Sequence, residues 1–358
     1  GTRHPSGAAT GLLTPLHAHP LLIHSPDHND SMTMKACIYG AGAIGGWLGV
    51  ALAQAGHPVS LVARRETLRA LQTQGLRMRR TDGTLAQVPV TAHSDPAAMG
   101  VQDLVVIAVK APGLPDVARA IAPLLGPHTV VLTAMNGVPW WFLDGVGGAA
   151  QGRALESVDT GGVIAQAIPA RSVLGGVVHA SCSLEAPGFV RHHFGDRLIL
   201  GEPDGSHSAR LLALADSLQR GGIQAEVSGC IQKDIWFKLW GNLTMNPISA
   251  LTGATTDRIL DDDLVRGFVS AVMLEAKAIG ERLGLPIEQQ PEDRHALTRK
   301  LGAFKTSMLQ DVEASKPLEI DALVGAVREL GQITSTPTPH TDALLGLVRL
   351  MARTRGLY

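Results

Sequence analysis

Short apolar runs of strand length recur through the first half of the chain, with stretches of helical character between them. The runs cover residues 35–39, 58–62, 103–109 and 129–133. The run Asp103–Val109 is apolar without alternation, as in strands that are buried on both faces. Trp47–Ala55 and Ser208–Gln219 suit helices. Strands that alternate with helices predict an α/β fold with a doubly wound, mostly parallel sheet.

The pattern changes after about residue 228. Before this point, further strand-like stretches occur at Val173–Ala180, Gly188–His192 and Leu198–Leu200. After it, the pattern is almost entirely helical, with interruptions at glycines and prolines. The chain has 358 residues, and at roughly 150 residues per domain this length suits two domains. We therefore predict an α/β domain over residues 34–228 and an all-helical domain over residues 229–358.

The first 33 residues fit neither domain. Five of the 14 histidines lie here, and the apolar residues follow neither a helical nor a strand period. Prolines and histidines interrupt every apolar stretch, which argues against a signal peptide. We expect residues 1–33 to be a disordered leader or a segment foreign to the natural protein, with the fold beginning at Met32 or Met34.

A glycine motif follows the first apolar run. Residues 40–45 read Gly-Ala-Gly-Ala-Ile-Gly, between the strand-like run and the helix-like stretch Trp47–Ala55. In this context GxGxxG indicates a Rossmann-type dinucleotide site, where the glycines allow a tight turn, backbone approach to a pyrophosphate and close packing of helix on strand. The predicted cofactor-binding residues of this loop are Gly40, Gly42, Ala43, Ile44 and Gly45.

The end of the second predicted strand favours NADP over NAD. An NAD enzyme places a carboxylate here for the ribose hydroxyls, whereas this chain reads Ala63-Arg64-Arg65. A guanidinium group can bind the 2′-phosphate of NADP through charge-assisted hydrogen bonds. We therefore expect Arg64 to bind the 2′-phosphate, with Glu66 as an alternative ribose acceptor.

Polar residues also follow the third and fourth strand-like runs. Lys110 comes directly after Asp103–Val109, and Asn136-Gly137 follows the run that ends at Thr133. The carboxyl ends of parallel strands face the ligand crevice. We expect Lys110 to face the cofactor or substrate and Asn136 to contact one of them, although Asn-Gly alone also suits an ordinary turn.

A third set of polar residues lies in the helical part. Lys238, Asn242 and Asn246 recur every four residues, so they share one face of a helix, amid Trp, Leu and Met. Such groups are costly to bury without partners. Farther on, Ser307-Met308-Leu309-Gln310-Asp311 precedes a segment that contains Glu319-Ile320-Asp321.

Charge and cysteine content exclude several classes of function. The 31 basic and 32 acidic residues give a net charge of −1, which lacks the basic excess of a nucleic-acid-binding protein. The uncharged stretch 120–143 is interrupted by glycine, proline and asparagine, so we expect no membrane span. The three cysteines show no metal-binding spacing, so we expect no metal site and a reducing, cytoplasmic location.

The apolar stretch Ala343–Met351 suits a homodimer interface or a core.

Together, the glycine loop, the Asn136-Gly137 turn, the KxxxNxxxNP segment and the SMLQD…EID segment resemble the ketopantoate reductase (2-dehydropantoate 2-reductase) family. The resemblance runs from about Met34 to Met351, and the last two motifs are the most specific. It implies NADPH-dependent reduction of the 2-oxo acid ketopantoate to (R)-pantoate for pantothenate and coenzyme A synthesis.

The resemblance also implies roles for individual residues. Lys238 matches the general acid that protonates the ketone oxygen, and Glu319 matches the carboxylate that binds the substrate hydroxyl and works with this lysine. The substrate-binding positions are Asn242, Asn246, Ser307 and Asn136. The positions beside the nicotinamide are Lys110 and Asn136, and the position at the 2′-phosphate is Arg64.

Three aromatic residues depart from the family pattern. Trp140-Trp141-Phe142 follows the Asn136-Gly137 turn, where smaller residues are expected. We expect Trp141 to pack in the core or between domains and Trp140 to lie near the pocket. A bulkier or aromatic 2-oxo acid is therefore an alternative substrate, and an NADP-sensing protein without catalysis is an alternative of another class.

Overall fold

The computed structural model describes residues 32–358, and Thr33–Tyr358 form one compact unit. The expected leader at residues 1–33 lies, apart from its last two residues, outside the described range. The last strand ends at Val227 and the long helix α6 begins at Ile231. The α/β fold with a helical C-terminal part is confirmed, while its division into separate domains at residue 228 stays a prediction.

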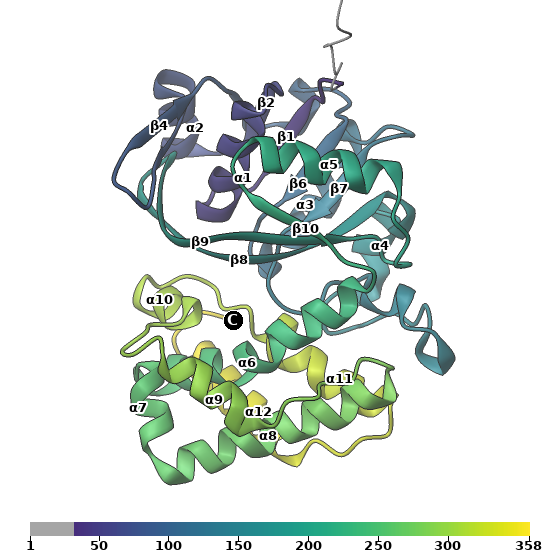
Figure 1. Cartoon of the computed structure of the whole chain (residues 1–358), viewed down its shortest axis with the longest axis vertical. Coiled ribbons are helices and arrows are strands. Elements are labelled where there is room, and N and C mark those ends of the chain that lie inside the picture. Colours follow the sequence, from purple (N-terminus) through teal and green to yellow (C-terminus); the bar gives the residue numbers. More distant parts are fainter. Residues whose placement is uncertain (1–31) are drawn as a thin grey trace, which may run out of the picture. The chain divides into compact units, whose positions relative to one another are not determined.

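Ten strands of the described chain form one mixed sheet, in the order β4-β3-β9-β8-β7-β6-β1-β2-β5 with β10 beside β9 (Figure 1). The strands are β1 (Ala36–Tyr39), β2 (Val59–Val62), β3 (Leu76–Arg79), β4 (Leu85–Val88), β5 (Thr91–His93), β6 (Leu104–Ile107), β7 (Val130–Thr133), β8 (Val173–Ala186), β9 (Phe189–Gly201) and β10 (Gln224–Val227). The neighbours β2, β1, β6, β7 and β8 are parallel. The four apolar runs of the first half are thus confirmed as strands of a parallel sheet.

The region after β8 differs from the expectation. Gly188–His192 and Leu198–Leu200 were expected to be separate strands, but both fall largely within β9. β9 pairs antiparallel with β8 along most of its length, with shifts of register near Ser181 and Ala186. The residues of β9 between the two apolar stretches are mostly exposed, and main-chain hydrogen bonds to β8 keep them in the strand. They show no apolar period, so the sequence pattern did not identify them as part of one strand.

Helices cover both faces of the sheet and form the C-terminal part. They are α1 (Ala43–Gln54), α2 (Arg65–Gln74), α3 (Leu114–Ala120), α4 (Val163–Ala167), α5 (Ala209–Arg220), α6 (Ile231–Thr252), α7 (Thr256–Asp261), α8 (Asp263–Arg282), α9 (Pro291–Arg299), α10 (Ser307–Glu313), α11 (Ala326–Ile333) and α12 (Pro339–Thr354). Alternate residues of β1 face opposite sides, so Ile38 packs with α1 and α5 while Tyr39 packs on the side of α3.

The core on the α3 side continues into the helical part. It runs through Trp141 and Phe142 to buried residues of α6, α8, α11 and α12. The rings of Phe142 and Trp236 lie 5.9 Å apart. Trp141 is 1% exposed, and it fills the space beside Gly175, where a Cβ would lie 2.5 Å from its ring. The expectation of core packing for Trp141 is confirmed, and this shared core joins the sheet to the helices.

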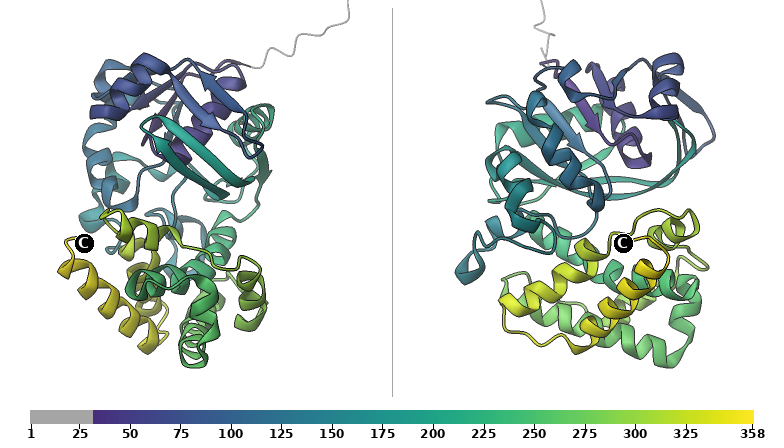
Figure 2. Two further views of the ribbon diagram at one scale, coloured as in Figure 1. Left: turned by 90° about the vertical axis from the view of Figure 1, so that its left-hand side faces the viewer. Right: turned by 180° about the vertical axis from the view of Figure 1, so that it is seen from behind.

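Helix α6 is central to the helical part and packs against α8, α10 and α12. Figure 2 shows these helices gathered on one side of the sheet, with the C-terminus where sheet and helices meet. The Leu318 N–H donates to the Leu357 carbonyl at 3.0 Å. In α12, Leu344, Leu345 and Val348 are buried, but Leu347 and Leu350 are exposed. The stretch Ala343–Met351 therefore serves the core and also leaves an apolar strip at the surface.

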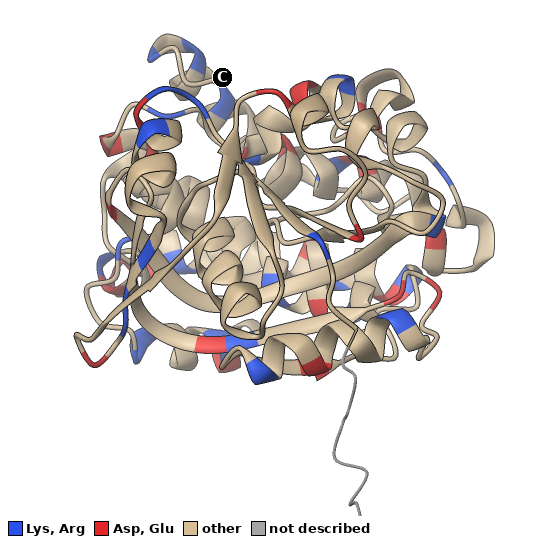
Figure 3. Cartoon of the chain, turned by 90° about the horizontal axis from the view of Figure 1, so that it is seen from above, with Lys and Arg blue, Asp and Glu red and all other residues tan. Residues whose placement is uncertain are grey.

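Charged residues of both signs are interspersed along the ribbon in the view of Figure 3, in keeping with the net charge of −1. Across residues 32–358, no helix combines the length and the apolar character that a membrane crossing requires.

Two glycines of the loop between β1 and α1 have different surroundings. A Cβ at Gly45 would lie 2.1 Å from the Gly40 carbonyl oxygen, so this glycine lets α1 pack closely on β1. A Cβ at Gly42, in contrast, would meet nothing within 4 Å. Gly42 precedes the first turn of α1, and no side chain caps this helix. The first N–H groups of α1 therefore have no side-chain acceptor.

We expect the two glycines to respond differently to substitution by alanine. Gly45→Ala forces the backbone apart and should lower the free energy of unfolding by about 1–3 kcal/mol or more. Gly42→Ala, at an extended N-cap position, should cost less than about 1 kcal/mol. Urea unfolding of both variants tests this, and equal losses of stability would contradict the assignment.

Candidate active site

The predicted cofactor residues lie along one edge of the sheet. In the register of the parallel strands, Val62, Tyr39, Ile107 and Thr133 are neighbours in that order. A predicted site residue follows each of them within three positions. In the same order, these residues are Arg64, Gly40, Lys110 and Asn136. The structure therefore brings these four positions to one edge, with the exposed Arg64 at the β2 end and Asn136 at the β7 end.

Lys238 reaches this edge from helix α6. Its Nζ donates to the Asn136 Oδ1 at 3.0 Å and to the Val178 carbonyl on β8. Burial lowers the pKa of Lys238 to about 8, against a smaller opposing effect of the Glu319 charge. A lysine with this pKa can exchange a proton near neutral pH.

The Asn136-Gly137 turn is held in place by the helical part. Gly137 has a φ of +83°, and a Cβ on it would lie 2.5 Å from the Ala322 carbonyl oxygen. The same carbonyl accepts the Val138 N–H at 2.9 Å. Only glycine fits this conformation and this approach, so the turn fixes Asn136 where Lys238 can reach it.

The two asparagines of α6 differ in their surroundings. Asn242 lines a narrow crevice together with Lys238 and Asn136. Asn246, one turn later, is 5% exposed and is not among the residues that line this crevice. Ser307 is exposed at the first residue of α10 and lines neither this crevice nor the larger cavity described below. The structure thus groups Asn242 with Lys238, whereas substrate contacts of Asn246 and Ser307 stay predictions.

Lys110 joins the sheet edge to two buried carboxylates. Its Nζ lies 2.9 Å from the Asp311 Oδ2 on α10 and 3.8 Å from the Glu319 Oε1. Glu319 also accepts the Ala111 N–H at 3.0 Å. Burial raises the pKa of Glu319, against the opposing charge of Lys110. Burial lowers the pKa of Lys110, but Glu319 and Asp311 together raise it overall.

Asp311 was not predicted as a site residue. The motif that contains it pointed to Ser307, while Asp311 is 8% exposed and pairs with Lys110. The sequence did offer a signal, since Asp311 is the acidic residue of that motif. A carboxylate that is buried requires a partner such as a lysine.

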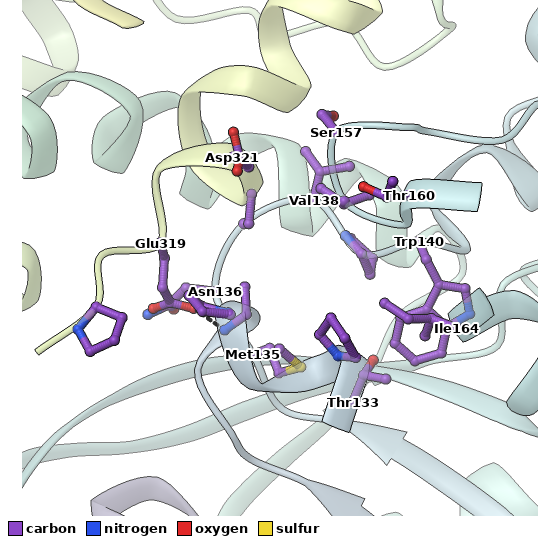
Figure 4. A pocket seen from close by; sticks show the side chains of 18 of the residues that line it. Thr133, Met135, Asn136, Val138, Trp140, Ser157, Thr160, Ile164, Glu319 and Asp321 are labelled. Carbon is purple, nitrogen blue, oxygen red and sulfur yellow. Dashed lines mark hydrogen bonds between the residues drawn. The ribbon is translucent and has the colours of Figure 1, made fainter. Parts of the chain in front are cut away.

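A cavity of about 500 Å³ opens between the strand ends and the helical part. Figure 4 shows Asn136 and Glu319 on one side of it and Trp140 and Ile164 on the other. Gly176 of β8 and Ile235 of α6 line both this cavity and the crevice at Lys238. The expectation that Trp140 lies near the pocket is confirmed. Within residues 32–358, no group of three or more His, Cys, Asp or Glu side chains could hold a metal ion.

Two family models and a curated relative match most of the chain. The family model described as "Ketopantoate reductase PanE/ApbA" matches residues 36–205, and "Ketopantoate reductase PanE/ApbA C terminal" matches residues 230–352. A 2-dehydropantoate 2-reductase of Mesorhizobium japonicum is 48% identical over 326 residues, which cover 91% of this chain and all of that protein.

Two solved structures share the fold. A Ralstonia solanacearum MolK2 protein, assigned provisionally as a ketopantoate reductase, is 60% identical and superposes with a TM-score of 0.87 over 90% of this chain and 99% of its own. The 2-dehydropantoate 2-reductase of Methylococcus capsulatus is 28% identical, with a TM-score of 0.76 over 90% of this chain and 97% of its own. With both family models and a relative of this identity matching nearly its whole described length, the chain belongs to the ketopantoate reductase family.

Proposed function

We propose that this chain reduces ketopantoate (2-dehydropantoate) to (R)-pantoate with NADPH, in the synthesis of pantothenate and coenzyme A. The observation that carries the proposal is the Lys238 ammonium, held by the Asn136 side chain at the carboxyl edge of the parallel strands. The names of the relatives support the substrate. A cytoplasmic location is part of the proposal, since all three cysteines are unpaired.

The residues present fit a dinucleotide. The open space at Gly42 lets the backbone approach a pyrophosphate, and the first N–H groups of α1, from Ala43 and Ile44, are available as donors. Arg64, exposed just after β2, would bind the 2′-phosphate of NADP. Lys110 and Asn136 follow the next strands, so they would lie at the nicotinamide end.

NADPH, when bound, supplies the hydride that adds to the carbonyl carbon. Negative charge then develops on the carbonyl oxygen, and Lys238 neutralises it by donating a proton from Nζ. Lys238 becomes a neutral amine, the product is a 2-hydroxy acid, and solvent returns the proton. Asn136 orients the ammonium, and the charge of Glu319 favours its protonated form.

A homodimer through the exposed leucines of α12 stays a prediction. One structural neighbour, from Staphylococcus aureus, is described as a dimeric ketopantoate reductase. At 20% identity, that neighbour shows the fold alone.

Removal of the proton donor should abolish most of the activity. We expect Lys238→Ala to lower kcat for ketopantoate by on the order of 10²-fold or more, measured as NADPH consumption at 340 nm. Lys233→Ala, at an exposed lysine of the same helix, is the matched control. A change within about threefold for Lys238→Ala would show that another group donates the proton. Wild-type protein that binds NADPH without reducing ketopantoate would favour the NADP-sensing alternative.

The pH profile should report the same lysine. The donor must be the charged ammonium, so activity is present below its pKa and is lost as pH rises through it. We expect kcat/KM for reduction to fall above pH about 8, approaching tenfold per pH unit. Stopped-flow or steady-state rates at several pH values test this. A profile in Lys238→Ala with the same break as the wild type would contradict the assignment.

Cofactor preference should depend on Arg64. Arg64→Ala should raise KM for NADPH about tenfold or more and leave KM for NADH nearly unchanged, because only NADPH carries the 2′-phosphate. Arg69→Ala, at an exposed arginine of α2, is the control. Equal effects of Arg64→Ala on both cofactors would reject the phosphate role.

A further inference from the structure

Helix α10 joins helix α6 to the carboxyl edge of the parallel strands. Figure 1 shows α10 on the side of the helical part that faces the sheet. At the start of α10, the Thr306 hydroxyl pairs with the Ser249 hydroxyl of α6 at 2.6 Å. Near its end, the Asp311 carboxylate accepts a hydrogen bond from the Lys110 ammonium at 2.9 Å. Asp311 is 8% exposed, so this bond fixes the last turn of α10 against the end of β6.

Asp311 also lies beside the segment that carries Glu319. Its main-chain carbonyl accepts the Lys316 N–H at 2.8 Å, which closes the turn after α10. Three residues later, Glu319 is held by the Ala111 N–H, which donates to its Oε2 at 3.0 Å. Two buried carboxylates therefore approach the same lysine, Lys110, from neighbouring segments of the chain.

Lys110 is not shared equally between these two carboxylates. Its Nζ lies 2.9 Å from the Asp311 Oδ2 but 3.8 Å from the Glu319 Oε1, and the second distance is too long for a hydrogen bond. The ammonium that donates to Asp311 is thereby held away from Glu319. The Glu319 carboxylate keeps its charge available to the other lysine of the site, Lys238.

The charge of Glu319 matters for the proton donor. It favours the protonated form of Lys238, and a cation bonded directly to Glu319 would weaken this effect. A further titratable group near Lys238 is His179 of β8. Burial, with a smaller effect of the Lys238 charge, lowers the pKa of His179 to about 4, so this ring is uncharged near neutral pH. The protonation of Lys238 therefore depends on how closely Lys110 pairs with Glu319.

We propose that Asp311 is a positioning residue, which takes the direct hydrogen bond of Lys110 and so leaves the Glu319 carboxylate to Lys238 and the substrate. The inference rests on the proposed function, because Lys238 is the proton donor in both. Without a carboxylate at position 311, Lys110 turns to Glu319, which is already only 3.8 Å away. Glu319 then supports the Lys238 ammonium less, and activity is lost at a lower pH.

The test is the pH dependence of ketopantoate reduction by NADPH in Asp311→Asn, which removes the charge and keeps the shape. We expect the alkaline break of kcat/KM to fall by about one pH unit relative to the wild type. Above the wild-type break this shift corresponds to a loss of about tenfold, and the loss should be much smaller below both breaks. Glu313→Gln, at an exposed carboxylate of α10 that pairs with Lys305, is the matched control and should leave the break unchanged.

Lys110→Met gives an opposite arm, because it removes the cation that competes for Glu319. Whatever its effect on the rate, this variant should keep the break at the wild-type pH or raise it. In the Lys110→Met background, Asp311→Asn should have little further effect on the break, since the two residues act through one contact. The Lys110→Met profile decides alone where Asp311→Asn does not fold.

A purely structural role of Asp311 predicts an equal loss at every pH and the same loss in both backgrounds. That result, or a break that Lys110→Met lowers as Asp311→Asn does, would overturn the inference and leave the proposed function standing. Wild-type protein that does not reduce ketopantoate would instead reject the proposed function, and this inference with it.

Discussion

The ammonium of Lys238 needs oxygen acceptors when it leaves water, and this requirement governs the arrangement of the site. One acceptor is the Asn136 side chain, and the other is the Val178 carbonyl. Asn136 is available because Gly137 packs against Ala322 and lets the turn seat against the helical part. An ammonium held in this way keeps few contacts with solvent, which lowers its pKa toward the range useful for proton transfer.

A shared core makes this arrangement possible. The apolar side chains on the α3 side of the sheet continue through Trp141 and Phe142 into the helical part. The ion pairs of Lys110 with Asp311 and Glu319 cross the same junction. Sheet and helices therefore meet through both apolar packing and buried charge, and the site lies where they meet. The carboxylates of Glu329 and Asp159 accept main-chain N–H groups of Glu156 and Ile164 beside the cavity.

Local patterns predicted the parallel strands β1, β2, β6 and β7, the glycine loop and the polar face of α6, because periodicity and turn chemistry depend on a few neighbouring residues. They did not predict the short strands β3, β4, β5 and β10. The partners of the site residues left no such signal. Val178 acts through its main-chain carbonyl, which every residue possesses. Asp311 and Lys110 are 201 residues apart in the chain, so only the fold brings them together. The roles of Asn246 and Ser307 rest on family resemblance, and neither lines the cavity.

The central claim is that the carbonyl oxygen of the substrate takes its proton from Lys238. A crystal structure with NADP and the bound 2-hydroxy acid product measures this most directly. The account predicts that the product hydroxyl oxygen lies within about 2.6–3.2 Å of Lys238 Nζ, with its carbon facing the nicotinamide. A product hydroxyl bound by another acid, with Lys238 still paired only to Asn136 and Val178, would contradict it.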